Sequence, residues 1–471
     1  MKDTLLAKLA PVGQQHLLAH WETLDEPARR RLASQIDTID WNDFARLRKE
    51  YSGVGDDAAA VQQKWRELAA RSVPPRAVRL GGEPAGFTRQ QAQQRGAEAL
   101  RAGKFGMILV AGGLGTRLGF DQPKGMFPLG PVSNRTLFEI LIDQLRAIGA
   151  AHGVRIPLYV MTSPATHEAT ETFLAEHNRF GLPADDLVLF QQGTMYAVDA
   201  QSFNVLLAER GEIFTGPDGH GGMLAALVKN KVLHNARSRG IEHFFYGQID
   251  NPLLTVCDPE LLGCHLLAES ELTTQVVAKT DPAEKVGVVV EVDGRTQIIE
   301  YVDLDPDDAK LKLPEGSLKF WAGNIAVHVL QVAFLERTAS QADALPFHTS
   351  RKKVPFVNAE GEQVEPTQPN AIRFERFIFD LLPLAERALV VEVDKAIAFA
   401  PVKNDDSSPT DSPSTSRTAM IAQATKLLRA AGADVADGIA VEVNPQWALD
   451  ATAAREKLGA NKRITQPTYF R

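Results

Sequence analysis

A glycine-rich turn directly after an apolar run constrains this chain more than any other feature. The run 106–111, Gly-Met-Ile-Leu-Val-Ala, has the pattern of a strand buried on both faces of a parallel sheet. The turn that follows carries glycines at 112, 113, 115 and 119, which let backbone N–H groups approach a phosphate closely. Arg117 and Lys124 add positive charge beside it, so the segment predicts a nucleoside triphosphate site.

Two commoner glycine-rich motifs do not fit this turn. A dinucleotide-binding fingerprint places its third glycine where this chain has Leu118, and Pro123 prevents a helix shortly afterwards. A P-loop ends in Gly-Lys-Ser or Gly-Lys-Thr, whereas Lys124 follows a proline. The turn therefore predicts a phosphate site of another kind.

The stretch 109–139 carries three short motifs in a characteristic order. They are Gly-Gly-Leu-Gly-Thr-Arg, Pro-Lys-Gly-Met-Phe and Thr-Leu-Phe-Glu. The stretch resembles the eukaryotic-type UDP-N-acetylglucosamine (UDP-N-acetylhexosamine) pyrophosphorylases of the UDP-sugar pyrophosphorylase family. The resemblance continues through weaker motifs over nearly the whole chain. It implies a Rossmann-like α/β fold of the nucleotide-diphospho-sugar transferase (GT-A-like) type, with a mixed sheet, an N-terminal helical region and a small C-terminal domain.

The alternation of elements supports this division of the chain. Residues 1–100 predict a helical region, 101–393 a catalytic nucleotide- and sugar-binding α/β domain, and 394–471 a small C-terminal domain that begins its helix near 417. The polar, proline-rich tract 404–416 predicts a mobile loop. The expected strands are 106–111, 157–161, 187–190 and 243–247, with helices at 136–150, 165–177 and 221–239, and strands at 273–278, 286–292 and 296–301 are expected to form an antiparallel extension.

Resemblance to the family implies how UTP is bound. In the motif Phe-Gln-Gln-Gly-Thr-Met, Gln192 would contact uracil through its amide, which carries a donor and an acceptor in one plane. In the motif Pro-Asp-Gly-His-Gly-Gly, His220 stands where this family has asparagine, and histidine is typical of the related UDP-glucose pyrophosphorylases. The implied nucleotide-binding residues are Leu109, Gly112, Gly113, Gly115, Thr116, Gln192, Gly219 and His220.

The same resemblance implies a metal ligand, a sugar site and three catalytic cations. Asp250 follows a predicted strand and corresponds to the aspartate that holds Mg²⁺, an ion that prefers one or two carboxylates plus phosphate oxygens. The implied sugar-binding residues are Asn251, Gly287, Glu300, Tyr301 and Asn324, and the implied catalytic residues are Arg117, Lys124 and Lys403.

The implied reaction joins UTP and N-acetylglucosamine 1-phosphate to give UDP-N-acetylglucosamine and pyrophosphate. Because His220 departs from the family pattern, glucose 1-phosphate, galactose 1-phosphate or a broad set of sugar 1-phosphates stays open as the substrate. A non-catalytic UDP-sugar sensor is a third hypothesis. A glycosyltransferase is disfavoured, since its Asp-x-Asp motif should end a strand, whereas Asp305-Pro-Asp307 lies in a charged loop.

Composition limits the remaining partners. The chain has 51 basic and 59 acidic residues, a net charge of −8, which argues against nucleic-acid or anionic-membrane partners. Cys257 and Cys264 have no metal-binding pattern and predict free thiols. No apolar signal segment or run of 18 apolar residues occurs, so we expect a cytoplasmic protein. The oligomeric state stays open between a monomer and a weak dimer.

Overall fold

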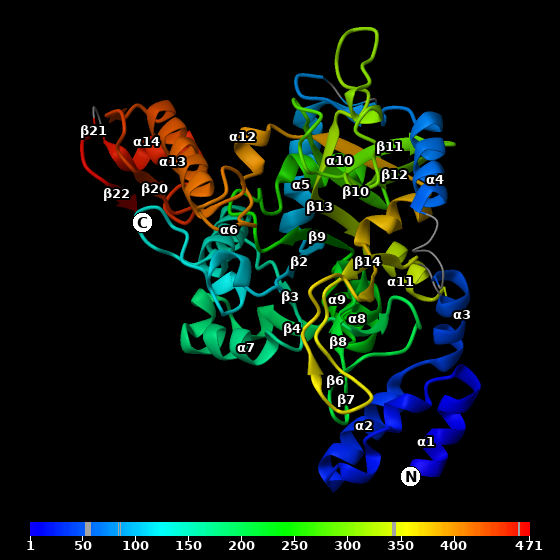
Figure 1. Cartoon of the computed structure of the whole chain (residues 1–471). Coiled ribbons are helices and arrows are strands. Elements are labelled where there is room, and N and C mark those ends of the chain that lie inside the picture. The colour runs from blue at the N-terminus through cyan, green and yellow to red at the C-terminus, as the bar shows by residue number, and fades with distance from the viewer. Residues whose placement is uncertain (52–57, 83, 85, 342–344, 460–461) are drawn as a thin grey trace. The chain divides into compact units, whose positions relative to one another are not determined.

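The computed structural model describes residues 1–51, 58–82, 84, 86–341, 345–459 and 462–471 of the chain (Figure 1). The chain forms two compact units, each assembled from segments that are distant in sequence. The first unit takes 1–67, 193–223 and 345–378, and the second takes 68–192, 224–344 and 379–471. The three domains expected from the sequence follow chain position only, so their boundaries stay a prediction.

A mixed sheet of ten strands forms the centre of the second unit. The strand order is β4-β3-β2-β9-β13-β10-β18-β1, and the hairpin β11–β12 joins it at β13. Strand β2 is parallel to β3 and β9, and β3 is parallel to β4, whereas β13 runs antiparallel to both β9 and β10. The expected mixed α/β fold is confirmed. The strands are β1 (Ala77–Val78), β2 (Phe105–Val110), β3 (Leu158–Thr162), β4 (Leu187–Gln191), β9 (His243–Gln248), β10 (Leu272–Ala278), β11 (Val288–Val292), β12 (Arg295–Ile299), β13 (Ala322–Gln331) and β18 (Ala388–Glu392).

The apolar runs became strands because both faces of the sheet are covered. In β2, Met107 and Leu109 join the larger apolar core while Ile108 is fully buried, as the continuous apolar pattern requires. Helices that contribute to this core include α5 (Arg89–Arg101), α6 (Leu137–His152) and α10 (Pro259–Leu267). Thr136 and Glu139 form a capping box at the start of α6, so this helix begins at a defined residue.

Four helices differ from what the sequence predicted. Helix α7 spans His167–Glu176 and α11 spans Val332–Ala339. The helix expected at 221–239 is interrupted: α8 (Met223–Lys229) and α9 (Val232–Ser238) are separated by Lys231, whose φ is 56°. Asn230 precedes this break, and its side chain donates to the carbonyls of Ala226 and Gln191 in competition with helical bonding.

The C-terminal part of the second unit has its own small apolar core. Helix α13 (Pro413–Ala430) begins four residues before the expected position because Ser412 caps it, so the end of the predicted loop 404–416 is helical. Helix α14 (Ala451–Leu458) was not expected. The remaining elements are α12 (Lys395–Ala398), β19 (Asp434–Val435), β20 (Val441–Val443), β21 (Arg463–Ile464) and β22 (Thr468–Phe470).

The first unit packs N-terminal helices against a four-stranded sheet of order β14-β17-β5-β8. Its core contains Leu9, Phe44, Phe203 and Phe374, which come from three separate segments of sequence. The helices are α1 (Lys2–Leu9), α2 (Glu26–Thr38), α3 (Trp41–Tyr51) and α4 (Ala58–Arg71), the last of which continues into the second unit, and the strands are β5 (Thr194–Asp199), β6 (Leu207–Glu209), β7 (Glu212–Ile213), β8 (Thr215–Pro217), β14 (His348–Lys352), β15 (Phe356–Val357), β16 (Gln363–Val364) and β17 (Ala371–Glu375).

No helix within the described ranges has the length and apolar character needed to span a bilayer.

Two helices of the second unit cross at a pair of glycines. Helices α5 and α10 approach so closely that a Cβ on Gly96 would overlap the carbonyl oxygen of Pro259. A Cβ on Gly263 would overlap the carbonyl oxygen of Ala92 in the same way. Both obstacles are backbone atoms, which cannot move aside as a flexible side chain can, so only glycine fits at this crossing.

We expect Gly96→Ala and Gly263→Ala each to destabilise the protein by about 3 kcal/mol, because the helices must separate to admit a methyl group. Urea denaturation measures the loss. Gly82→Ala is the matched control, since a Cβ there would stand 3.4 Å from the nearest atom, an ordinary contact. Equal denaturation midpoints for all three variants and the parent would contradict the close crossing.

Candidate active site

Four parallel strands of the second unit end at one edge of the sheet. The glycine turn follows β2, Ser163 follows β3, Gln192 follows β4, and Asp250 lies two residues beyond β9. In open α/β sheets, this carboxyl edge is where ligands bind. The structure therefore brings to one edge the residues that the sequence placed after separate strands.

The glycine turn is closed by hydrogen bonds to the segment that carries Lys124. The N–H of Gly115 donates to the carbonyl of Gln122 (2.9 Å), and the N–H of Lys124 donates to the carbonyl of Gly113 (3.0 Å). Among the described residues, none accepts a hydrogen bond from the N–H groups of Gly112, Gly113 or Leu114. Consecutive N–H groups of this kind can bind the oxygens of a phosphate.

Lys124 and Asp250 form the charged centre of this edge. The Lys124 ammonium lies 3.8 Å from a carboxylate oxygen of Asp250, and both side chains are largely buried, with 17% and 15% of their surface exposed. The carbonyl of Asp250 accepts the N–H of Val402 at 2.8 Å, which fixes the neighbouring Lys403 to the same region. Arg117 lies within the glycine turn, between Gly115 and Gly119, and is exposed.

Asn251 holds the chain segment that leads to Lys403. Its side-chain nitrogen donates to the carbonyl of Ala398 (2.7 Å), and its oxygen accepts the N–H groups of Leu253 (3.3 Å) and Ala400 (3.2 Å). Only 3% of the residue is exposed. The amide nitrogen keeps a second N–H that a sugar oxygen could accept from, so the predicted sugar contact stays a prediction, and the visible role of Asn251 is to position the segment 398–403.

Gln192 lies against the glycine turn. The position that a Cβ of Gly112 would occupy lies 2.9 Å from the Gln192 amide oxygen and 3.1 Å from the backbone nitrogen of Ser163, so a glycine lets the turn pack closely here. The backbone N–H of Gln192 donates to the carbonyl of Thr162, and the hydroxyl of Ser163 donates to the carbonyl of Gly112. Ser163 was missed by sequence reasoning, although its position after a strand is a signal.

Leu109, a predicted nucleotide-binding residue, lies on β2. Its side chain is fully buried in the larger apolar core and packs against one face of the sheet.

Three of the predicted sugar-binding residues meet at the β11–β12 hairpin. The N–H of Asn324 donates to the carbonyl of Gly287 (2.8 Å), and a carboxylate oxygen of Glu300 stands 2.6 Å from the Cβ position of Gly287. The amide oxygen of Asn324 accepts the N–H of Ala326 at 3.0 Å. Tyr301, the fourth residue of this region, is 44% exposed. A carboxylate and an amide at one place can bind the hydroxyl groups of a sugar.

Gly219 and His220 belong to the first unit. The N–H of Ile378 donates to Nδ1 of His220 (3.1 Å), and the imidazole stacks on Phe377 with ring centroids 5.2 Å apart. Burial lowers the pKa of His220 to about 4, so the ring is neutral at pH 7 and carries its proton on Nε2. Gly219 has a φ of 84°, a conformation that favours glycine.

Asp218, which sequence reasoning did not select, fills the space beside two glycines. Its carboxylate occupies the positions that Cβ atoms on Gly193 and Gly222 would need. Within the described part of the chain its buried Oδ1 has no hydrogen-bond partner, and burial raises the pKa of the carboxyl to about 6. Asp218 thus packs two loops together, one following Gln192 and one containing His220. The motif was visible in the sequence, but the burial of its acid was not.

Comparison with known proteins identifies the family. The sequence profile of the family UTP–glucose-1-phosphate uridylyltransferase matches residues 41–425. The chain belongs to this family. Within the UTP–glucose-1-phosphate uridylyltransferase family, the chain is similar to the UDP-N-acetylglucosamine pyrophosphorylase of Saccharomyces cerevisiae, with 34% identity over 92% of each chain. It is also 34% identical to the UDP-N-acetylhexosamine pyrophosphorylase-like protein 1 of Homo sapiens, over 92% of this chain and 86% of that protein.

A solved structure supports the fold of this family member. The UDP-N-acetylglucosamine pyrophosphorylase of Trypanosoma brucei, solved in complex with an inhibitor, superposes with a TM-score of 0.81. The match covers 100% of this chain and 98% of that chain at 24% identity, which shows the fold. The resemblance read from the motifs at 109–139 is confirmed by these matches.

The buried acid of the first unit has a measurable consequence for stability. Because the folded pKa of Asp218 is about 6 and the usual value is near 4, the folded state binds the proton more tightly than the unfolded state. The stability that this proton contributes is present below pH 4 and is lost as the pH rises through 6. Relative to Asp218→Asn, we expect the parent to lose about 2 kcal/mol between pH 4 and pH 7.

Urea denaturation of both proteins at several pH values measures this difference. The comparison with Asp218→Asn cancels the titration of all other groups. Parallel stability curves for the two proteins would show that the Asp218 carboxyl titrates normally.

Proposed function

We propose that the protein is a UTP–sugar-1-phosphate uridylyltransferase that makes UDP-N-acetylglucosamine and pyrophosphate from UTP and N-acetylglucosamine 1-phosphate. The observation that carries this proposal is the approach of Lys124 to Asp250 at the sheet edge that carries the glycine turn. That arrangement supplies phosphate-binding N–H groups, a cation and a carboxylate at one place. The names of the relatives support the choice of sugar.

The chemistry requires little beyond positioning and charge. The attacking group is an oxygen of the sugar phosphate, which is already anionic at neutral pH, so no general base is needed. The barrier arises from repulsion between two phosphate-bearing substrates and from charge that develops on the leaving pyrophosphate. Fixed cations and N–H groups lower this barrier by holding the reactants in line and by balancing the charge.

The residues at the sheet edge have distinct proposed roles. The N–H groups of 112–114 and the exposed Arg117 would hold the β- and γ-phosphates. Lys124 would contact the α-phosphate, and Lys403, held beside Asp250, would contact the phosphate of the sugar. These contacts orient the sugar phosphate for in-line attack on the α-phosphorus.

Asp250 fits a role as a magnesium ligand. Its carboxylate is partly exposed, and the distance of 3.8 Å to the Lys124 ammonium is longer than a hydrogen bond, so its oxygens have lone pairs to offer. Mg²⁺ is commonly held by one or two carboxylates together with substrate phosphates and water. When bound, the ion would neutralise phosphate charge, while Lys124 keeps the carboxylate in place.

Recognition of the two organic groups is proposed for separate residues. Gln192 would bind uracil through its amide, and His220 would contact the nucleotide. Glu300 and Asn324, which meet at Gly287, would bind sugar hydroxyl groups. His220 stands where the family pattern has asparagine, and a neutral histidine cannot copy the donor and acceptor pair of an amide. Glucose 1-phosphate therefore stays the alternative substrate.

Pyrophosphate release from UTP and Mg²⁺ across a panel of sugar 1-phosphates tests the proposal. The panel contains N-acetylglucosamine, N-acetylgalactosamine, glucose and galactose 1-phosphates. We expect strong release with N-acetylglucosamine 1-phosphate and weak release with glucose 1-phosphate. A preference for glucose would assign His220 to sugar selection, and silence with every sugar would favour a UDP-sugar sensor.

Lys124→Ala should lower turnover by roughly 10²–10³, the cost of removing one preorganised charge contact. Steady-state assays of pyrophosphate release measure the effect. Lys104→Ala is the matched control, because Lys104 pairs with Glu242 at the protein surface and should leave turnover unchanged. Similar turnover in Lys124→Ala and the parent would remove Lys124 from the reaction.

Asp250→Asn should raise the Mg²⁺ concentration needed for half-maximal activity by about tenfold or more, since a neutral amide is a poorer ligand for a hard cation. Titration of activity with MgCl₂ measures this shift. Asp293→Asn serves as a control, because Asp293 is an exposed residue that pairs with Arg71. An unchanged Mg²⁺ requirement in Asp250→Asn would exclude Asp250 as a ligand.

A further inference from the structure

The N-terminal end of helix α13 contacts the segment that carries Lys403. Ser416, a fully buried residue near the start of this helix, donates its hydroxyl to the carbonyl of Ala400 at 2.8 Å. The carbonyl of Pro401 lies 3.2 Å from the same hydroxyl, so the two carbonyls share one proton. One buried hydroxyl thus holds the two peptide groups that lie just before Val402 and Lys403.

The end of β9 holds this segment from another side. The carbonyl of Asp250 accepts the N–H of Val402 at 2.8 Å, and the Asn251 side chain bonds to the backbone of residues 398 and 400. The carbonyl of Asp411, just before the cap of α13, accepts the N–H of Lys403 at 2.7 Å. The position of Lys403 therefore depends on α13 as well as on β9.

Arg417, the next residue of α13, contacts the segment that follows Lys124. Its Nε donates to the carbonyl of Leu129 at 3.3 Å, and its Nη2 donates to the carbonyl of Pro128 at 3.0 Å. Leu129 is fully buried. The N–H of Phe127 donates to the carbonyl of Lys124 at 3.0 Å, so the segment held by Arg417 continues directly from the turn that carries this lysine.

Two neighbouring residues of one helix therefore join the segments of Lys124 and Lys403. The backbone there is fixed, because Ser416 donates its N–H to the carbonyl of Ser412, the residue that caps the helix. In the proposed reaction, the two lysines contact the phosphates that must meet in line. A misplacement of about 1 Å can slow such a reaction by roughly 10²-fold, so the spacing of the two segments matters for the rate.

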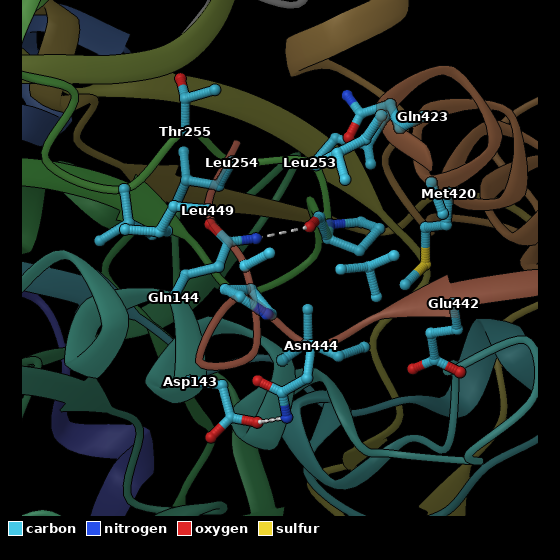
Figure 2. Close-up of a pocket in the computed structure, with 18 of the residues that line it drawn as sticks. Asp143, Gln144, Leu253, Leu254, Thr255, Met420, Gln423, Glu442, Asn444 and Leu449 are labelled. Carbon is cyan, nitrogen blue, oxygen red and sulfur yellow. Dashed lines mark hydrogen bonds between the residues drawn. The ribbon is translucent and has the colours of Figure 1, made fainter. Parts of the chain in front are cut away.

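The next turns of α13 are less closely packed on one side. Met420 and Gln423 of this helix line a cavity of about 400 Å³ together with Leu253, three residues after Asp250 (Figure 2). Side chains that face a cavity lose van der Waals contacts on that side. The hydrogen bonds at the N-terminal end of α13 therefore contribute more to fixing the helix against the sheet edge.

We propose that Ser416 and Arg417 are positioning residues for the uridylyl transfer and that together they set the spacing between Lys403 and Lys124. This inference rests on the proposed function. Ser416 acts through Lys403, and Arg417 acts through Lys124.

Steady-state pyrophosphate release tests Ser416. Ser416→Ala leaves two carbonyls without their donor, so kcat/KM for the preferred sugar 1-phosphate should fall about tenfold while KM for UTP changes less than about twofold. Thr418→Ala is the matched control, because the exposed Thr418 donates its hydroxyl to the carbonyl of Ser414 within the same helix. Kinetics equal to those of the parent in Ser416→Ala would overturn its positioning role.

A double-mutant cycle separates positioning from a loss of folded protein. If Ser416 acts through Lys403, Ser416→Ala should change kcat/KM less than about twofold when Lys403→Ala is already present. A purely structural role would lower kcat/KM by the same factor in both backgrounds. That result would overturn the proposal for Ser416.

The corresponding cycle for Arg417 uses Lys124. Arg417→Ala should lower turnover about threefold to tenfold in the parent and less than about twofold in Lys124→Ala. Arg429→Ala is the matched control, since Arg429 also lies on α13 and donates to a backbone carbonyl, that of Val435, at 2.7 Å. Equal losses in the two backgrounds would overturn the role of Arg417.

Amide hydrogen exchange followed by mass spectrometry tests the positioning without a reaction. The N–H groups of residues 402–404 are all hydrogen bonded, and Ser416→Ala should speed their exchange at least about fivefold while Thr418→Ala leaves it unchanged. Unchanged exchange in Ser416→Ala would show that its hydroxyl does not fix the segment. If the parent releases no pyrophosphate with any sugar, the proposed function fails, and the exchange experiment still decides whether Ser416 holds this segment.

Discussion

A few hydrogen bonds at the end of β9 join the parts of the candidate active site. The Asp250 carbonyl accepts the N–H of Val402, and the Asn251 side chain bonds to the backbone of Ala398 and Ala400. These bonds fasten a segment near the C-terminal end to the centre of the sheet. Because the proposed chemistry depends on fixed charge rather than on a reactive nucleophile, the position of Lys403 matters as much as its presence.

The mixed character of the sheet separates two kinds of binding residue. The phosphate and uracil candidates follow β2, β4 and β9, which belong to the parallel half of the sheet. Four of the five sugar candidates lie on β13 or beside the ends of the β11–β12 hairpin attached to it, whereas Asn251 follows β9. Strand β13 runs antiparallel to β9, so it brings the hairpin to the sheet without a crossover helix. One sheet therefore carries both groups of candidates.

The sequence predicted the elements better than their connections. Apolar runs such as 106–111 and 243–247 form strands because they are buried on both faces, and the motifs placed the glycine turn and Asp250 at strand ends. Sequence could not predict that Asn251 bonds to Ala398, since these residues are 147 positions apart. It also missed helix α14, the break at Lys231 and the buried carboxyl of Asp218, because each depends on packing against distant parts of the chain.

The first unit is assembled from three distant segments of the chain, and this has a consequence for how it folds during synthesis on the ribosome. Phe44 of α3 packs near Phe203 and Phe374, so the core of this unit needs residues made about 330 positions later. At a translation rate of 5–20 residues per second, the apolar faces of the N-terminal helices wait roughly 15 to 65 seconds for their last partners. During that interval the nascent chain presents uncovered leucine and phenylalanine side chains, a state that chaperones recognise. Fast folding of the N-terminal helices alone would not shorten the delay, because the missing surface has not yet been made.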